Sequence, residues 1–348
     1  MSTPTNIQVE ITPWKHDAQF VYSMTYDEGT IDAICNSFPI HEEHGIPGHV
    51  CTVSGHLGQQ RLVRGTSMRE VFYMNPEQLR FLINKGWTIS SHSHTHVPTD
   101  QDGIDLDLEV RLSKWELEKA TGAPVRLFAY WGNLRIADKI LPVAKDAGYQ
   151  GMLSIGNPWN TADYDVWDIM RHTIGRDMER WLEEPTVSIY RHSRDAFLNE
   201  LTKENTHGNW LVDISHIVVD RLPAANGPSL WNRCMTPAIL DARLREVRAL
   251  WGNELWATVP EDVVEYTLLR RACSVTVMAD DSDRATCTVS LNGLRDDVTA
   301  RELTFRAETP WRNATVNGGA VSSQMKDGTI VWTAAVEDGT EFVLSAST

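Results

Sequence analysis

The feature that most constrains the fold is a repeated alternation of short apolar runs with segments of helical spacing. The expected strands are FVYSM at 20–24, VCTV at 50–53, WTIS at 87–90, VRLFAY at 125–130 and YQGMLSIG at 149–156. The expected helices occupy 31–45, 75–86, 107–121 and 137–148. Strands that alternate with helices form parallel sheets with crossover helices. The pattern therefore predicts an α/β fold, specifically a (β/α) barrel or a close variant of one.

After about residue 273 the pattern changes to short stretches of alternating polarity, separated by the turn signals NGG, KDG and EDG. This texture predicts a small all-β, sandwich-like domain. No Pro-rich or Gly-rich linker precedes it, so we expect it to pack rigidly against the barrel. The predicted domains are residues 1–272 and residues 273–348.

Composition limits the partners and the location of the chain. The 32 Lys and Arg residues face 47 Asp and Glu residues, for a net charge of -15. This balance makes nucleic acids and anionic membranes poor partners. No apolar run is long enough to span a membrane, and the N-terminus lacks a signal-peptide pattern. A cytoplasmic protein is predicted, or a secreted one if a leader has been removed. Five cysteines without a CxxC pair indicate neither a disulfide framework nor a thiolate zinc site.

Three histidines lie within SSHSHTH at 90–96, directly after an expected strand. Imidazole nitrogens are common ligands of borderline metals, and His92 and His96 could point at one ion. His94, which lies between them, is expected to point elsewhere. Because barrel enzymes carry their chemistry at the carboxyl ends of the strands, this position favours a metal site.

Two adjacent carboxylates, Asp27 and Glu28, end the first expected strand. Successive residues point in different directions, so one carboxylate can ligate a metal while the other takes a proton from water. Two histidines and one carboxylate leave coordination positions open for water and a substrate carbonyl. This set predicts a hydrolase site.

Two further strand ends carry candidate catalytic groups. His216 follows the apolar run WLVDIS and is a natural general acid for a leaving group. The aromatic turn FAYWGN at 128–133 could supply a backbone N–H to an oxyanion and an apolar wall to a substrate.

In this order, the four motifs resemble those of the polysaccharide deacetylase family with the NodB homology fold, also called carbohydrate esterase family 4. TYDEG is similar to the family's TFDDG motif, and SHSHTH is similar to its H[ST]xxH motif. FAYWGN resembles the FAYPYG form of the third motif, and DISH resembles the leucine-x-histidine motif. The resemblance covers about residues 15–270.

The resemblance implies a distorted (β/α) barrel that hydrolyses N- or O-acetyl groups of carbohydrates with one divalent metal ion. It implies a zinc ion, with nickel or cobalt as alternatives, and an acetylated mono- or oligosaccharide substrate. The implied roles are a catalytic base, a general acid, an oxyanion donor through its backbone N–H, and three metal ligands. The resemblance assigns the base to Asp27, the acid to His216 and the oxyanion donor to Tyr130. It assigns the metal ligands to Glu28, His92 and His96.

The chain departs from the family pattern at several positions. Glu28 replaces the usual Asp, which leaves the identity of the metal less certain. The third motif lacks the family's arginine, so the partner that orients the base is expected to be Arg171 or Arg176. The fourth motif has no clear counterpart, and Asp165 and Asp168 are weak candidates for its acid. The aromatic residues proposed to stack on sugar rings are Trp131, which is favoured, Trp159 and Trp167.

Two alternative functions remain open from the sequence. The same site could serve an allantoinase-like hydrolase acting on a non-sugar amide or a cyclic imide. The chain could also be an inactive carbohydrate-binding protein in which the β domain provides recognition or dimerisation. A homodimer is possible because symmetric dimers are frequent among soluble enzymes.

Overall fold

The computed structural model describes residues 7–60, 72–99, 102–131, 136–156, 159–174, 201–219, 234–279, 281–311, 313–319, 323–324 and 328–347. The chain divides into two compact units, Phe20–Glu261 and a second one formed by Met1–Gln19 together with Asp262–Thr348. The expected division after residue 272 differs from this one. Most of helix α9 (Pro260–Ala272) and strand β1 (Gln8–Ile11) group with the C-terminal unit.

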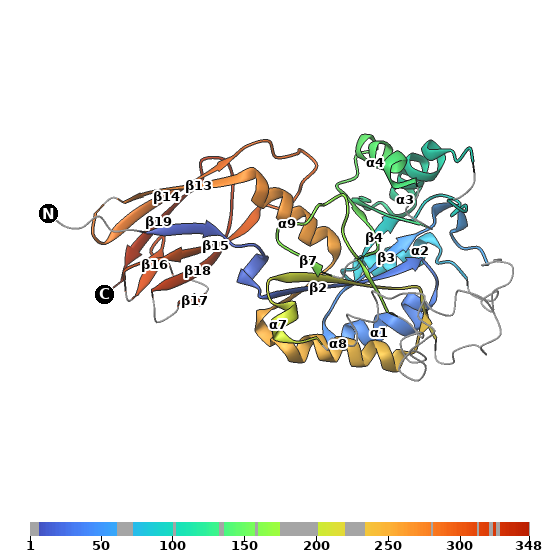
Figure 1. Cartoon of the computed structure of the whole chain (residues 1–348), viewed down its shortest axis with the longest axis horizontal. Coiled ribbons are helices and arrows are strands. Elements are labelled where there is room, and N and C mark those ends of the chain that lie inside the picture. The colour runs from blue at the N-terminus through green and yellow to red at the C-terminus, as the bar shows by residue number, and fades with distance from the viewer. Residues whose placement is uncertain are drawn as a thin grey trace. The chain divides into compact units, whose positions relative to one another are not determined.

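The first unit is built on a nine-stranded, largely parallel sheet with the path β6-β5-β4-β3-β2-β9-β7 (Figure 1). Off this path, β12 (Leu255–Ala257) pairs with β2 and β8 (His172–Thr173) pairs with β9. The strands on the path are β2 (Phe20–Glu28), β3 (Gly48–Thr52), β4 (Thr88–Ser91), β5 (Leu127–Ala129), β6 (Gly151–Leu153), β7 (Trp159–Asn160) and β9 (Asn209–Ser215). Among the described strands of this sheet, only β7 runs antiparallel to its neighbour.

Backbone hydrogen bonds close this sheet on itself. Beyond β6, the amide of Met152 donates to Val166 and the amide of Ser154 donates to Ile169. The segment that contains these acceptors continues into β8, which pairs with β9. The sheet thus returns to β9, and the distorted barrel of the NodB type that the sequence predicted is confirmed.

Strand β2 is buried along its whole length, and its alternation sorts its residues onto two faces. Phe20, Tyr22, Met24 and Tyr26 belong to the core beneath the helices. Asp27 has the opposite parity to these residues and therefore faces the other side of the sheet. This parity places a carboxylate inside the barrel at the carboxyl end of a central strand.

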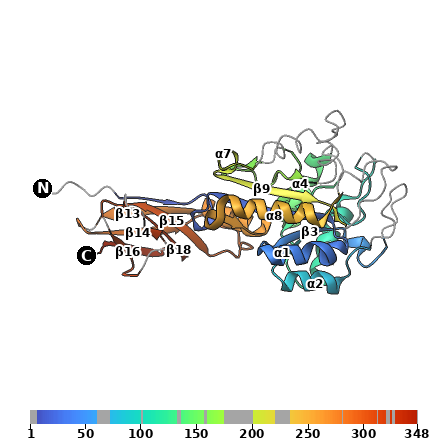
Figure 2. The ribbon, with the colours of Figure 1, turned by 90° about the horizontal axis from the view of Figure 1, so that it is seen from below.

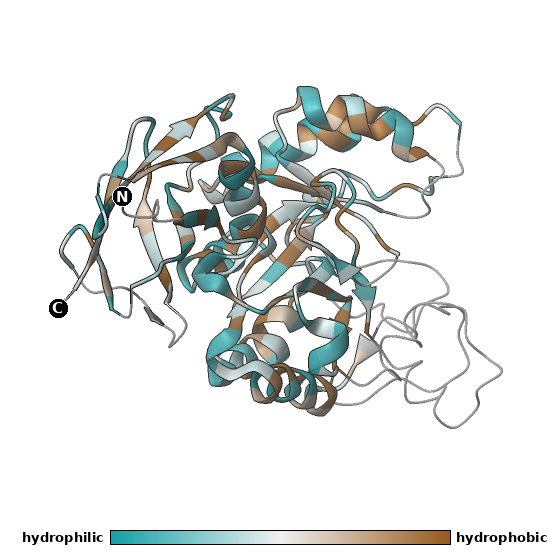
Figure 3. Cartoon of the chain, turned by 60° about the vertical axis from the view of Figure 1, so that its left-hand side comes forward, coloured by the Kyte–Doolittle hydropathy of each residue, from teal (hydrophilic) through white to brown (hydrophobic). Residues whose placement is uncertain are grey.

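Helices cover the outside of the sheet. They are α1 (Phe38–His44), α2 (Pro76–Asn84), α3 (Ser113–Thr121), α4 (Ala137–Asp146), α7 (Lys203–Thr206) and α8 (Pro237–Trp251). Asn75 is the N-cap residue of helix α2, and its side chain forms a reciprocal capping box with Gln78. Helices α1 and α8 lie side by side (Figure 2). The helices carry both hydrophobic and hydrophilic residues (Figure 3), as expected for helices with one face on a core. No helix among the described residues is long and apolar enough to cross a membrane.

The second unit contains two four-stranded antiparallel sheets, which confirms its predicted all-β character. One sheet has the order β1-β15-β18-β17 and the other β13-β14-β19-β16. Their strands from β13 onward are β13 (Cys273–Ala279), β14 (Arg284–Leu291), β15 (Glu302–Glu308), β16 (Ala314–Val316), β17 (Ser323–Gln324), β18 (Thr329–Ala335) and β19 (Glu341–Ala346). Phe305 and Trp332 of the first sheet meet Phe342 of the second, with ring centroids 5.1–5.9 Å apart. An aromatic core therefore joins the two sheets.

Candidate active site

The carboxylate of Asp27 lies at the carboxyl end of β2 and forms a buried ion pair with Arg171. The Arg171 Nη1 donates to Asp27 Oδ1 at 2.7 Å, and Nη2 lies 3.4 Å from Oδ2. Arg171 is fully buried, and its Nε donates to the carbonyl of Ser154, which follows β6. Burial alone would raise the pKa of Asp27, but Arg171, His92 and His216 hold that pKa well below its usual range. Asp27 is therefore ionised at neutral pH.

His92 lies beside this carboxylate in a defined tautomer. Its Nδ1 is 3.1 Å from the carbonyl oxygen of Ala129 in β5, and its Nε2 is 3.6 Å from Asp27 Oδ2. Because a carbonyl oxygen only accepts, Nδ1 carries the proton and Nε2 presents a lone pair. Burial lowers the pKa of His92 to about 4, so the ring is neutral. A neutral imidazole anchored through Nδ1 is the form that ligates a metal.

His96 is the second ring of the pair. The His92 and His96 rings have centroids 5.0 Å apart. The backbone N–H of His96 donates to Ser93 Oγ at 2.9 Å, and both of these residues have positive φ. His94 points away from the pair, as expected, because its Nδ1 lies 2.9 Å from Ser54 Oγ.

Glu28 ends β2 with a φ of 76°, a conformation that is uncommon for a residue with a side chain. It is buried and lies near Asp32. Burial raises the pKa of Asp32 to about 6, and the charge of Glu28 adds to this rise. Among the described residues, no group of three or more His, Cys, Asp or Glu side chains lies close enough together to hold a metal ion. The tautomer of His92 thus fits a metal ligand, whereas the full set Glu28, His92 and His96 is not assembled as a three-residue group.

His216 follows β9 and is 6% exposed. Its charge is one of those that lower the pKa of Asp27, which puts it within electrostatic reach of the candidate base. The strand ends of β2, β4 and β9 therefore place Asp27, His92 and His216 in one region, as the barrel hypothesis expects.

The aromatic turn after β5 is arranged differently from the prediction. The backbone N–H of Tyr130 donates to the carbonyl of Leu153 at 2.9 Å, so this N–H is used by the sheet rather than offered to an oxyanion. Trp131 is 1% exposed, and its Nε1 donates to the carbonyl of Val97 at 2.6 Å. A ring buried in this way cannot stack on a sugar, so Trp131 is a packing residue.

The structure places two of the remaining sequence candidates against the core, and a third lies outside the described residues. Trp159 is a partly buried residue of β7 that packs on the core. Trp167 is also partly buried, and Lys145 Nζ lies 5.2 Å from its ring centroid. Arg176 lies outside the described residues. Of the two arginines expected to orient the candidate base, Arg171 is the one that contacts Asp27.

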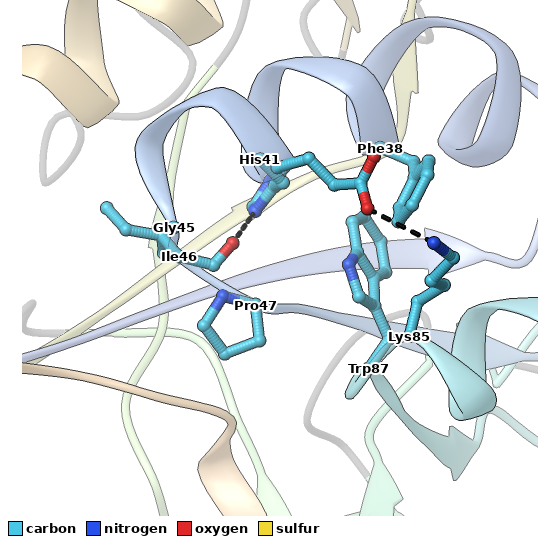
Figure 4. Close-up of a pocket in the computed structure, with 8 residues that line it drawn as sticks. Phe38, His41, Gly45, Ile46, Pro47, Lys85 and Trp87 are labelled. Carbon is cyan, nitrogen blue, oxygen red and sulfur yellow. Dashed lines mark hydrogen bonds and ion pairs between the residues drawn. The ribbon is translucent and has the colours of Figure 1, made fainter.

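A pocket of about 290 Å³ lies near residues 45–47 and 85–87, which precede β3 and β4 (Figure 4). It is thus at the end of the strands opposite to Asp27. Phe38 and Trp87 form its apolar wall, and Lys85 Nζ lies 3.4 Å from Glu42 Oε1. The imidazole of His41 is satisfied at both nitrogens, by Tyr26 and by the carbonyl of Ile46. The polar groups named here already have hydrogen-bond or ion-pair partners, and the pocket lies away from Asp27. We therefore do not take it as the candidate active site.

Comparison with known proteins gives one family match. The family model described as polysaccharide deacetylase matches residues 15–152, which contain β2 to β5, Asp27 and the histidine pair and end within β6. The match covers less than half of the 348 residues, and it relates this stretch of the chain to the polysaccharide deacetylase family. This matched stretch supplies Asp27, Glu28, His92 and His96, while Arg171 and His216 come from the chain that follows it.

Solved structures with a similar fold include a family 4 carbohydrate esterase from Streptomyces lividans in complex with acetate. It is 14% identical, with a TM-score of 0.41, over 69% of this chain and 92% of that one. The deacetylase PplD of Streptococcus pyogenes, in complex with acetate, is 19% identical with a TM-score of 0.37, over 46% and 68%. A putative polysaccharide deacetylase from Bacillus anthracis is 18% identical with a TM-score of 0.35, and the match covers 43% of this chain and only 45% of that one. No curated protein sequence matches the chain.

A second buried charge network, on β9 of the first unit, was not identified from the sequence. Asp213 accepts hydrogen bonds from Tyr22 Oη at 2.9 Å, Arg243 Nε at 2.8 Å and His172 Nδ1 at 3.0 Å. Asp213 and Arg243 are both buried. His172 directly follows Arg171, so adjacent residues serve the two buried carboxylates. The only sequence signal was an Asp within an otherwise apolar strand, which requires a partner.

Proposed function

We propose that the chain is a metal-dependent hydrolase that removes N- or O-linked acetyl groups from a carbohydrate. The match of residues 15–152 to the polysaccharide deacetylase family model supports the reaction class. The observation that carries the proposal is the buried Asp27 carboxylate, paired with Arg171 and 3.6 Å from the lone-pair nitrogen of His92.

In this proposal Asp27 is the general base. Arg171 holds the carboxylate ionised and in a fixed orientation, so it can accept a proton from a water molecule. The water oxygen forms a bond to the acetyl carbonyl carbon. The bond from that carbon to the sugar nitrogen or oxygen then breaks, and acetate is released.

His216 is proposed as the general acid that gives a proton to the departing amine or alcohol. The charge of His216 reaches Asp27 from the end of a different strand, which supports a role for both groups in one reaction. The products are acetate and the free amine or hydroxyl of the sugar.

The proposed metal ligands are His92 and His96, with Glu28 as the acidic ligand. The tautomer of His92 and the proximity of the two rings support this assignment. A divalent cation held there, for which zinc is the first choice and nickel or cobalt alternatives, would polarise the acetyl carbonyl and lower the pKa of a water. The proposed substrate is an acetylated mono- or oligosaccharide.

The test is acetate release from a panel of acetylated sugars, measured together with metal content before and after chelation. We expect stoichiometric metal, chelator-sensitive acetate release and a loss of roughly 100-fold or more in kcat for Asp27→Asn. Asp163→Asn, which changes an exposed residue, is the matched control. Full activity of Asp27→Asn would refute the assigned base. Ring-opened products from cyclic imides, without acetate, would instead support the non-sugar amidohydrolase.

A further inference from the structure

The loop that carries His92 and His96 is held by a buried carboxylate from another element. Glu109 belongs to the helical segment η4 (Asp107–Leu112) and is 2% exposed. Its Oε2 accepts the backbone N–H of His94 at 3.0 Å and that of Thr95 at 2.9 Å. Its other oxygen accepts the Thr95 hydroxyl.

These three bonds account for a charge that would otherwise be costly to bury. Bonds from neutral donors to a carboxylate are shorter and stronger than bonds between neutral groups. The two amides lie at the centre of the loop, between the two candidate ligands. Glu109 therefore fixes the backbone path from one histidine to the other.

A second carboxylate holds the same loop through a side chain. His94 Nδ1 lies 2.8 Å from Glu116 Oε2, and the Ser54 hydroxyl donates to the same oxygen at 2.7 Å. Glu116 lies on α3, which continues directly from η4, so one helical stretch supplies both carboxylates.

The backbone of the loop requires such support. Ser93 and His96 have φ values of 70° and 54°, in the left-handed region that residues with side chains rarely adopt. Strained conformations of this kind persist only where the surroundings hold them. Glu109 provides the most buried of these contacts.

We propose that Glu109 is a positioning residue that holds His92 and His96 in the arrangement needed to share one divalent cation. The inference rests on the proposed function and adds a residue that lies outside the ligand set. Glu109 acts through backbone amides and does not touch the cation.

The experiment measures the zinc and cobalt dissociation constants of the full chain by calorimetry, along with urea unfolding. Glu109→Ala removes all three bonds, and we expect affinity to fall roughly 10- to 100-fold. Glu109→Gln keeps an oxygen for the two amides and an NH₂ group for the Thr95 hydroxyl, so it should bind within roughly threefold of the native chain. Leu117→Ala truncates a buried core residue of α3 and is the control for a general loss of stability. It should unfold more readily and still bind metal as the native chain does.

Should Glu109→Ala fail to fold, Thr95→Val removes only the hydroxyl bond and is expected to weaken binding roughly two- to fivefold. Native affinity in the variants that fold would overturn the inference and leave the proposed function intact. Equal weakening by Glu109→Ala and Leu117→Ala would also overturn it, because stability rather than loop position would then control binding. A native chain that takes up none of zinc, cobalt or nickel would overturn the proposed function and, with it, this inference.

Discussion

At the scale of single residues, the charge of the candidate base depends on a partner 144 positions away in the sequence. Arg171 has no exposed surface, so its attraction to Asp27 acts in a region from which water is excluded. Arg171 thus keeps Asp27 ionised and also fixes the orientation of its carboxylate oxygens.

Replacing Arg171 by Met should lower kcat/KM for acetate release by roughly 100-fold or more, because the base loses both its charge partner and its orientation. The unpaired buried carboxylate should also cost about 3–5 kcal/mol of unfolding free energy. Arg171→Lys retains the positive charge but not the planar guanidinium group. Its kcat/KM and its unfolding free energy should therefore lie between those of the native chain and those of Arg171→Met. Steady-state kinetics and urea unfolding measure both effects. Native kinetics in Arg171→Met would contradict the role given to the pair.

Trp131 and Trp159 allow packing to be separated from substrate contact. Trp131→Phe removes a buried hydrogen bond to Val97, so we expect a loss of about 1–3 kcal/mol in unfolding free energy with KM unchanged. Trp159→Phe changes a partly buried ring and should leave stability within about 1 kcal/mol. A KM that rises only in Trp131→Phe would restore the sugar-stacking role predicted from the sequence.

The sequence allowed Asp27, His92 and His96 to be singled out because each follows an apolar strand, and such strand ends converge in a barrel. Arg171 could be given only as one of two candidates, since its pairing depends on how the chain returns from β6 to β8. The exposure of Trp131 could not be inferred, because a position in a turn does not determine whether a ring faces solvent. The use of the Tyr130 N–H by β6 likewise depends on strand register.

At the scale of elements, Asp213 joins three parts of the first unit, Phe20–Glu261. It lies on β9 and binds Arg243 of α8, His172 of β8 and Tyr22 of β2. Burial alone would raise the pKa of Asp213, but Arg243 and His172 lower it to about 2. Because the folded pKa lies below the ordinary value of 3.8, ionised Asp213 stabilises the fold above about pH 4. This stabilisation is lost as the pH falls from about 4 towards 2.

Asp213→Asn should therefore reduce the unfolding free energy by about 3–5 kcal/mol at pH 7, because Arg243 is left buried without its carboxylate. The difference from the native chain should shrink by about 2 kcal/mol as the pH is lowered from 5 to 2. Urea titrations across this pH range measure it. Asp146→Asn, in an exposed ion pair with Arg111, is the control and should change stability by less than about 1 kcal/mol. A constant difference from pH 7 to pH 2 would contradict the assigned pKa.

The existence and type of most elements in the first unit could be predicted from periodicity, because β2, β3 and β4 are short apolar runs between helical patterns. The closing strand could not be predicted. β8 has only two residues, and its pairing with β9 comes from tertiary context rather than from a local pattern.

At the scale of the whole molecule, the β unit is completed from the other end of the sequence. Strand β1 pairs with β15 in the register Gln8 to Glu308, and Thr12 continues the contact through the carbonyl of Thr304. This pairing lies outside the reach of sequence patterns, because a four-residue strand with half-exposed side chains gives no indication of its partner.

Deleting residues 1–11 should weaken the β unit selectively. The lost burial of Val9 and Ile11 and the opened edge of β15 should lower the unfolding free energy of that unit by roughly 2 kcal/mol. Limited proteolysis with mass spectrometry should show earlier cleavage after residue 262 and unchanged protection of residues 20–261. Equal loss of protection in both regions would contradict the division of the chain into two units.

The pairing of β1 with β15 also affects the order in which the chain can fold during translation. The two strands are about 300 positions apart, and a ribosome adds roughly 5 to 20 residues per second, so β15 is made about 15 to 60 seconds after β1. Within that interval the whole of Phe20–Glu261 leaves the ribosome and can fold. Strand β1 therefore stays without its β15 partner while residues 20–261 are translated and can fold, and such an unpaired edge is prone to pairing with other chains.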